Sequence, residues 1–250
     1  MIGHIEAIFI DDGGVMQDNE RRGQQWLRLL PEYLVPIYGG QKEKWAESNT
    51  EVLRRQMPLF IEGTGFPEVG GFVETRRALA VESVQIMFDY VGIAPPKTDD
   101  DCYDLYQSYT DHVINRVHAD IPGAVDAIRS LSASGYRLYT ASGTESAQLQ
   151  LMLDVMGIRH LFTKMYGPDL VDTHKGGSNY YRLVLEHAGE SPDGALFIDD
   201  SSKCVSWAQD AGATAVLVSQ NQPDANSAVQ VVPDLAALPL LLEFRKPEPG

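Results

Sequence analysis

Two pairs of adjacent aspartates, each directly after a short apolar run, are the residues of this sequence best suited to do chemistry. Asp11-Asp12 ends one run and is followed by two glycines, and Asp199-Asp200 ends the other. Burying a carboxylate is costly unless a cation or hydrogen-bond donors compensate its charge. Such positions indicate a metal site or a nucleophile, whereas the simpler alternative is a strand followed by an acidic turn.

The elements that must position these carboxylates are two buried strands. The runs Ile5–Ile10 and Ala195–Ile198 are rich in Ile, Leu and Phe, which is typical of strands buried on both faces. If they lie in one parallel sheet, four carboxylates meet at its carboxyl edge, the usual ligand side of such sheets. Because that many like charges repel strongly without a cation, the pattern favours a hard divalent ion with oxygen ligands, such as Mg²⁺.

The second half of the chain predicts the rest of that sheet. Strand-like runs alternate there with helix-like runs, and this order is typical of crossover connections between parallel strands. The expected strands are Tyr136–Ala141, Leu161–Tyr166, Ala195–Ile198 and Thr214–Val218. The expected helices are Gly123–Ser134, Glu145–Met156, Ser178–His187, Lys203–Ala211 and Asp234–Phe244.

Residues 17–120 lack this alternation and predict an all-helical insert. We expect a helical stretch over Trp26–Tyr38 that is interrupted by its two prolines, a loop over Met57–Gly71, and three further helices. Those helices are Lys44–Gln56, Thr75–Val91 and a segment from Thr98 or Asp99 to about Val117. The predicted fold is therefore α/β: a Rossmann-like parallel sheet core, 1–16 and 121–250, with an inserted all-helical domain, 17–120.

Four motifs, taken in order, resemble the haloacid dehalogenase superfamily of aspartate-nucleophile hydrolases. They are Asp11–Met16, the strand Tyr136–Ala141 ending in Ser142-Gly143, Lys175, and Asp199-Asp200. The first motif, with Gly-Gly-Val, is most similar to the branch that includes the phosphatase half of soluble epoxide hydrolases. In this superfamily, a helical insert between the first two motifs is a cap over the active site.

The resemblance implies a mechanism and a role for each motif. Asp11 is the expected nucleophile, forming an aspartyl-phosphate, with Ser142 and Lys175 as further catalytic residues. Mg²⁺ is expected at the Asp11 side chain, the Gly13 carbonyl and Asp200, with Asp199 as a second ligand or as an acceptor beside the site. The implied phosphate-binding residues are Asp12, Gly13, Ser142, Gly143 and Lys175.

Three positions depart from the family pattern. Gly13 stands where family phosphatases carry an acidic residue, a group worth ~10²–10⁴ in rate. Asp12 is not expected to replace it, because neighbouring side chains on an extended backbone point opposite ways. Gly176 stands where Pro usually follows the lysine, and Cys204 where Asp or Asn often supports the metal. Three residues could replace the missing acid: His174, His118 and Asp18. The simpler expectation for each is an exposed surface residue without a role in catalysis.

Other residues leave alternatives open. Thr140 is a second candidate for binding phosphoryl oxygens. Three Arg-Arg pairs in the insert are expected to be solvated, although one could reach the cleft and bind an anionic part of a substrate: Arg21-Arg22, Arg54-Arg55 and Arg76-Arg77. Four aromatic residues are expected in the core of the insert rather than on a substrate surface: Trp26, Tyr33, Trp45 and Phe60.

Composition narrows the class of protein. The chain has 250 residues, 44% hydrophobic and 22% charged, and a net charge of −15, which argues against nucleic-acid binding. No apolar run is long enough to cross a membrane, so we expect a cytoplasmic protein, monomer or homodimer, with Cys102 and Cys204 as reduced thiols.

The first functional expectation is a Mg²⁺-dependent hydrolase of a small phosphorylated metabolite or acyl phosphate. The alternatives are a phospho-ligand-binding or regulatory protein with little turnover, which the missing acid at Gly13 supports, and a 2-haloacid dehalogenase. The Asp199-Asp200 pair disfavours the dehalogenase. Dehalogenation of this kind needs no cation, so the charges of these two carboxylates would stay uncompensated.

Overall fold

The computed structural model describes residues 4–62, 66, 70–221 and 229–243. Among them a single parallel sheet has the strand order β3-β2-β1-β4-β5-β6. β1 is central and pairs with β2 on one side and β4 on the other, with Ile10 level with Thr140 and Ile198. The strands are β1 (Ala7–Ile10), β2 (Arg137–Ala141), β3 (Phe162–Tyr166), β4 (Ala195–Asp199), β5 (Thr214–Val218) and β6 (Gln230–Val232).

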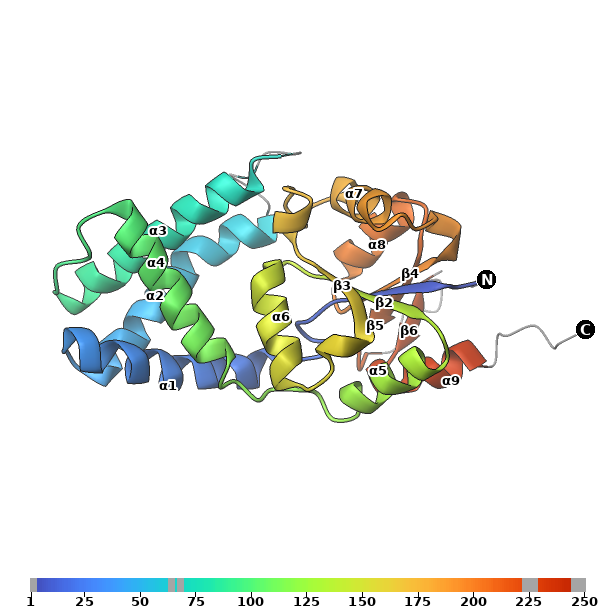
Figure 1. The fold of residues 1–250 in the computed structure, drawn as a ribbon, viewed down its shortest axis with the longest axis horizontal. Helices are drawn as coiled ribbons and strands as arrows, with labels where there is room; N and C mark the ends of the chain where they lie inside the picture. Colours follow the sequence, from blue (N-terminus) through green and yellow to red (C-terminus); the bar gives the residue numbers. More distant parts are fainter. Residues whose placement is uncertain (1–3, 63–65, 67–69, 222–228, 244–250) are drawn as a thin grey trace, which may run out of the picture.

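Helices cover both faces of the sheet (Figure 1). Ile8 and Ile10 point to the face packed by α5 (Ala124–Ala133), α6 (Ser146–Val155) and α9 (Leu238–Glu243). Phe9 points to the other face and stacks on Phe197 with ring centroids 4.5 Å apart, under α7 (Ser178–Ala188) and α8 (Ser202–Asp210). Alternate residues of β1 thus serve two separate apolar cores, which explains why the strand is apolar throughout. This confirms the predicted Rossmann-like α/β class.

The segment between β1 and α5 is helical and forms its own apolar cluster beside the sheet (Figure 1). Trp45 is fully buried in this cluster and packs edge-on against Phe88, with ring centroids 5.0 Å apart. Asp18 and Thr98 cap the first and last of these helices with their side-chain oxygens. The helices are α1 (Asn19–Tyr38), α2 (Lys42–Glu62), α3 (Phe72–Val91) and α4 (Asp99–Ile114).

Several predicted boundaries were wrong. α1 runs without interruption through Pro31 and Pro36, and α2 continues past Pro58 to Glu62, into the predicted loop. The remainder of that loop lies partly outside the described residues. β6 was not predicted. The last helix is split into the 3₁₀ turn η4 (Leu235–Ala237) and α9, and Phe244 lies outside the described residues. Three further 3₁₀ turns connect core elements: η1 (Arg159–Leu161), η2 (Pro168–Leu170) and η3 (Pro192–Gly194).

Polar contacts, among them those at the starts of α1 and α3, hold the helical insert against the carboxyl ends of the strands. Arg22 of α1 forms an ion pair with Asp12, with a nitrogen–oxygen distance of 2.6 Å. At the start of α3, the amides of Gly71 and Val73 donate to the carboxylate of Asp172, each at 2.9 Å. Gly71 is the N-cap residue of α3 but has no side chain that could accept from these amides. The carboxylate of Asp172, a residue of the core, takes over this capping role. The insert is therefore fixed directly over the edge where Asp11 lies.

Candidate active site

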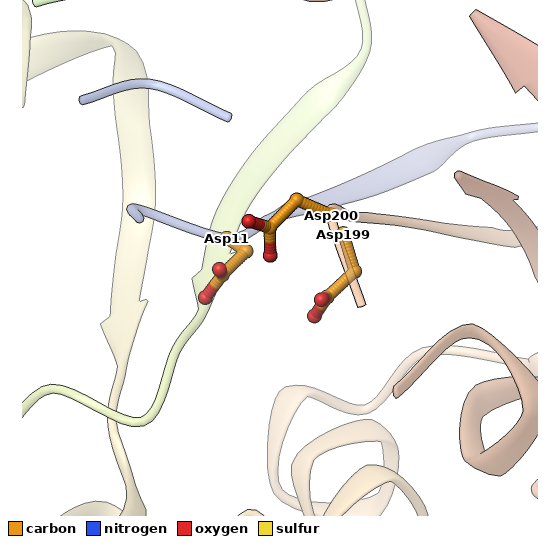
Figure 2. Close-up of side chains that lie close together, drawn as sticks. All are labelled: Asp11, Asp199 and Asp200. Carbon is orange, nitrogen blue, oxygen red and sulfur yellow. The ribbon is translucent and has the colours of Figure 1, made fainter. Parts of the chain in front are cut away.

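Three carboxylates meet where β1 and β4 end, as their parallel pairing requires. Ligand oxygens of Asp11, Asp199 and Asp200 all lie within 4.8 Å of one another. Figure 2 shows the Asp11 side chain beside the other two. Asp11 and Asp199 are buried, whereas Asp200 is exposed. The sequence-based expectation that the two aspartate pairs share one sheet edge is thus met in space.

Lys175 joins two of these carboxylates. Its ammonium donates to Asp11 Oδ1 at 2.9 Å and to Asp199 Oδ2 at 2.7 Å. Although burial alone would lower the pKa of Lys175, the two aspartates raise it well above its usual value, so the side chain stays charged. The amide of Gly176 donates to the His174 carbonyl at 2.7 Å, a bond that proline could not make. The Gly at this position therefore fits the local turn.

The charge balance of the cluster leaves room for a cation. Burial raises the pKa of Asp11 well above its usual range, and Lys175 offsets only part of this effect. Partial removal from water at the edge of the cluster, together with the charge of Asp199, also raises the pKa of Asp200. With Asp12 included, four carboxylates face two cationic side chains, Lys175 and Arg22, which leaves two negative charges. A hard divalent cation with carboxylate ligands matches both the charge and the donor set.

Asp12, which was expected among the phosphate-binding residues, lines the same cavity as Asp11. The chain bends at Asp12, which is 3% exposed and accepts hydrogen bonds from the hydroxyls of Ser142 and Thr144. Burial acts to raise the pKa of Asp12, but Arg22 and the Ser142 hydroxyl outweigh it, and the pKa lies below its usual value. Asp12 is therefore a carboxylate, unsuited to donate a proton. The Ser142 hydroxyl has one proton, and that proton goes to Asp12.

The two glycines after the aspartates differ in what they allow. Gly14 has φ +72°, and a Cβ there would lie 2.0 Å from Asp200 Oδ2, so a side chain at this position would be strained and would have to displace the Asp200 carboxylate. Gly13 has no such backbone constraint. A Cβ at Gly13 would lie 2.7 Å from Asn19 Oδ1 and 3.2 Å from Arg22 Nη2. Side chains of α1 thus border the space that an acidic residue at this position would use.

None of the suggested substitutes for the acid lies in the cavity. His174 stacks on Phe66, with ring centroids 4.4 Å apart, and burial lowers its pKa. His118 is exposed, and Asp18 caps α1 by accepting from two amides. Thr140, the second candidate for phosphate binding, donates to the Tyr166 carbonyl at 3.1 Å and is fully buried away from the site.

A cavity of about 730 Å³ extends from the carboxylate cluster into the insert. Gly13, Gly143 and Cys204 line it near the cluster. Of the paired arginines, Arg22 and Arg76 line the cavity, whereas Arg54 and Arg55 bind Glu51 at the surface. Two aromatics that were predicted to lie in the core of the insert, Trp26 and Phe60, line it as well.

Asn19 and Thr144 were not predicted as site residues, and both contact the network around Asp12. Thr144 Oγ1 lies 3.3 Å from Asp12 Oδ2, and Asn19 Oδ1 accepts from Arg22 at 2.7 Å. Asn19 precedes Arg22 by three positions at the start of α1, so a helix boundary placed correctly would have put both on one face. For Thr144, the signal available in the sequence was its position two residues after Ser142.

Comparisons with known proteins identify the family. The profile of the family described as haloacid dehalogenase-like hydrolase matches residues 78–218, more than half of the chain. Phosphoglycolate phosphatase 1 of Pseudomonas aeruginosa is 28% identical over 144 residues, which are 57% of this chain and 50% of that protein. Phosphoglycolate phosphatase of Rhodospirillum rubrum is 29% identical over 133 residues, 52% of this chain and 54% of that protein. The match spans about half the length of these relatives.

Solved structures share the fold over nearly the whole chain. L-2-haloacid dehalogenase from Xanthobacter autotrophicus, with chloropropionic acid covalently bound, superposes with a TM-score of 0.60 at 18% identity, covering 97% of this chain and 100% of that one. The HAD-hydrolase YfnB from Bacillus subtilis, bound to magnesium, superposes with a TM-score of 0.65 at 21% identity, covering 96% and 99%. At these identities the likeness concerns the fold.

Proposed function

Because the chain belongs to the haloacid dehalogenase-like hydrolase family, we propose that it hydrolyses a phosphate ester or an acyl phosphate through a phosphorylated Asp11. The observation that carries the proposal is the Lys175 ammonium held between Asp11 and Asp199 at one end of the cavity. This arrangement supplies a carboxylate nucleophile and a fixed cation within reach of one phosphoryl group. The phosphoglycolate phosphatases among the relatives support the same reaction class.

The proposed reaction has two steps. Asp11 attacks phosphorus, and the bond between phosphorus and the leaving-group oxygen breaks with its electron pair on that oxygen. Water then attacks the phosphorus of the aspartyl-phosphate, which releases inorganic phosphate and restores the Asp11 carboxylate. Lys175 stabilises the negative charge on the phosphoryl oxygens throughout.

Magnesium is the proposed cofactor. Asp11, Asp199, Asp200 and the Gly13 carbonyl would hold the ion, which when bound supplies electrostatic stabilisation of the transferred phosphoryl group. A cation bound there would also lower the pKa of Asp11, which is raised first by burial and then by the charges of Asp199 and Asp12. The nucleophile would then be ionised at neutral pH.

Two further elements of the proposal concern the insert and its family branch. We propose that α1–α4 act as a cap, because they are fixed over the carboxyl ends of the strands by the Arg22–Asp12 and Asp172–Gly71 contacts. The Gly13-Gly14-Val15 sequence supports a placement near the phosphatase half of soluble epoxide hydrolases.

That the protein is cytoplasmic and a monomer or homodimer stays a prediction. No helix within the described residues has the length and apolar character needed to span a membrane.

A second candidate is a protein that binds a phosphorylated ligand but turns it over slowly. The hydrogen bond from Ser142 to Asp12 favours it, because a phosphoryl group must compete with Asp12 for that hydroxyl. The absence of an acid at Gly13 favours it further. The rate at which Asp11 becomes phosphorylated in a single turnover separates the two functions, since a protein that mainly binds the ligand would form the phosphorylated residue slowly or not at all.

The experiment that tests the first proposal is a screen of phosphate esters, acyl phosphates and 2-haloacids, with and without Mg²⁺. We expect Mg²⁺-dependent release of phosphate that Asp11→Asn abolishes. Halide release from 2-haloacids without Mg²⁺ would instead identify a dehalogenase, the activity named for several proteins of similar fold.

A further inference from the structure

The cavity beside Asp11 is walled by one continuous face of α2. The cavity-lining residues of this helix recur at helical spacing, so they form a single stripe along its length. All of them are uncharged, and four are apolar: Asn49, Val52, Leu53, Gln56, Met57 and Phe60. Other apolar side chains complete the wall from α1, α4, α6 and the segment after α4: Trp26, Tyr109, Ile114, Val117 and Met152.

Part of this wall is apolar surface that the fold leaves open to water. Leu53 and Met57 are 47% and 43% exposed although they face a cavity. Covering such surface with an apolar group is favourable in proportion to the area removed from water. A volume near 730 Å³ lies within the range of ~300–1,000 Å³ that is typical of sites for drug-sized organic molecules.

Each cationic side chain that lines the cavity, within the described part of the chain, already has a carboxylate partner. Lys175 binds Asp11 and Asp199, and Arg22 binds Asp12. The third cation, Arg76, binds Glu145 with a nitrogen–oxygen distance of 3.1 Å and also donates to the Tyr106 hydroxyl. A second anionic group on a ligand would therefore have to displace one of these carboxylates.

We propose that the substrate carries one anionic phosphoryl head and an uncharged apolar body, alkyl or aromatic, that lies along α2 against Leu53 and Met57. This inference rests on the proposed phosphatase function and names its substrate class. Small phosphorylated hydroxy acids, which carry a second negative charge and no apolar body, fit the cavity poorly. The phosphoglycolate named for two relatives is of that kind.

The test measures binding rather than turnover, so that it stands apart from the catalytic proposal. Dissociation constants of n-alkylphosphonates from methyl to octyl are measured by titration calorimetry in the presence of Mg²⁺. We expect the constant to fall by up to about fourfold per methylene, from roughly 0.8 kcal/mol per buried CH₂. Phosphonoacetate, which adds a carboxylate instead of apolar surface, should bind more weakly than propylphosphonate.

Matched variants identify the wall that makes the contact. Leu53→Asp and Met57→Asp should flatten the dependence on chain length, and both positions are exposed enough to accept a charge in the folded protein. Ile37→Asp is the control, because Ile37 is 56% exposed on α1 and does not line the cavity. It should leave the dependence unchanged.

The outcomes are separable from those of the catalytic proposal. A dissociation constant independent of chain length, tighter binding of phosphonoacetate than of propylphosphonate, or equal effects of Ile37→Asp and Leu53→Asp would overturn this inference. The hydrolysis of acetyl, butyryl and hexanoyl phosphates, whose leaving groups have similar pKa values, tests the proposed function independently. Chain-dependent phosphonate binding without any hydrolysis would support the apolar site and refute the phosphatase.

Discussion

The Arg22 guanidinium, in the first turns of the helical insert, lies 2.6 Å from the carboxylate of Asp12, the residue directly after Asp11. The same carboxylate accepts the Ser142 hydroxyl from the end of β2. One buried anion therefore links the insert, the central strand and its neighbour.

Breaking this link should destabilise the protein. Arg22→Met leaves the buried Asp12 charge without its cation, a loss of about 1–3 kcal/mol in the free energy of unfolding. Urea denaturation without Mg²⁺ measures it, and Arg55→Met, which removes an exposed partner of Glu51, is the control. Because Arg22 lowers the pKa of Asp12, the difference from wild type should shrink as the pH falls and Asp12 becomes protonated. A loss no larger than that of Arg55→Met would contradict this assignment.

Magnesium should stabilise the folded wild type through the carboxylate cluster. An ion that binds only the folded state adds about 2.7 kcal/mol at a hundredfold excess over its dissociation constant. Asp200→Ala should abolish the rise in melting temperature, whereas Asp210→Ala, an exposed aspartate at the end of α8, should keep it. If Asp200→Ala responds to Mg²⁺ as the wild type does, the proposed metal site is wrong.

Without an acid at Gly13, the rate of the first step should depend steeply on the pKa of the leaving group. Acyl phosphates and esters of acidic phenols should react, and alkyl phosphates should be slow. Pre-steady-state rates over a series of aryl phosphates give the slope. A slope near zero would mean that another residue supplies the proton.

Gly13→Asp should not by itself restore fast hydrolysis of alkyl phosphates. The new carboxyl group would lie beside Arg22 and Asn19, and the guanidinium would lower its pKa and hold it ionised. Gly13→Asp combined with Arg22→Met should make the rate less dependent on the pKa of the leaving group. The rate for the poorest leaving groups should rise by up to ~10²–10⁴. Rescue by the single substitution would show that Arg22 does not control that position.

Far from the site, Glu190 should contribute to stability in a pH-dependent way. It accepts from Arg137 and from the Tyr139 hydroxyl, each at 2.7 Å, and the Arg137 hydrogen bonds lower its pKa from the usual 4.5. This stabilisation is present above the unfolded-state pKa and is lost as the pH falls through the lower folded-state value. Glu190→Gln should cost about 1 kcal/mol at pH 7, less toward pH 3, by urea denaturation. The exposed Glu186→Gln on α7 should cost nothing at either pH.

The sequence predicted the core fold well because the strands that carry the aspartates are strongly marked. Every residue of β1 and β4 is buried, as expected for strands in the interior of a parallel sheet. The aspartates follow directly where these apolar runs end. The insert was predicted less well. Pro31 and Pro36 disfavour a helix locally, but burial of Leu30 and Leu34 in the insert core outweighs that cost.

Within the site, alternation failed where the strand ends. The rule that neighbours point opposite ways holds only while the backbone is extended, and the chain bends at Asp12, one residue after the last amide that pairs with β4. The resulting contact of Asp12 with Ser142 joins residues 130 positions apart, and no local pattern encodes it. The surroundings of His174 depend in the same way on aromatic residues of the insert.

The phosphorylation of Asp11 is the central claim, and one measurement tests it most directly. Wild-type protein is mixed with excess acetyl phosphate and Mg²⁺, quenched in acid within a single turnover, digested and examined by mass spectrometry. We expect one phosphoryl group on the peptide that carries Asp11, formed before free phosphate appears and absent in Asp11→Asn. Release of phosphate without any modified Asp11, or an unchanged modification in Asp11→Asn, would contradict the account.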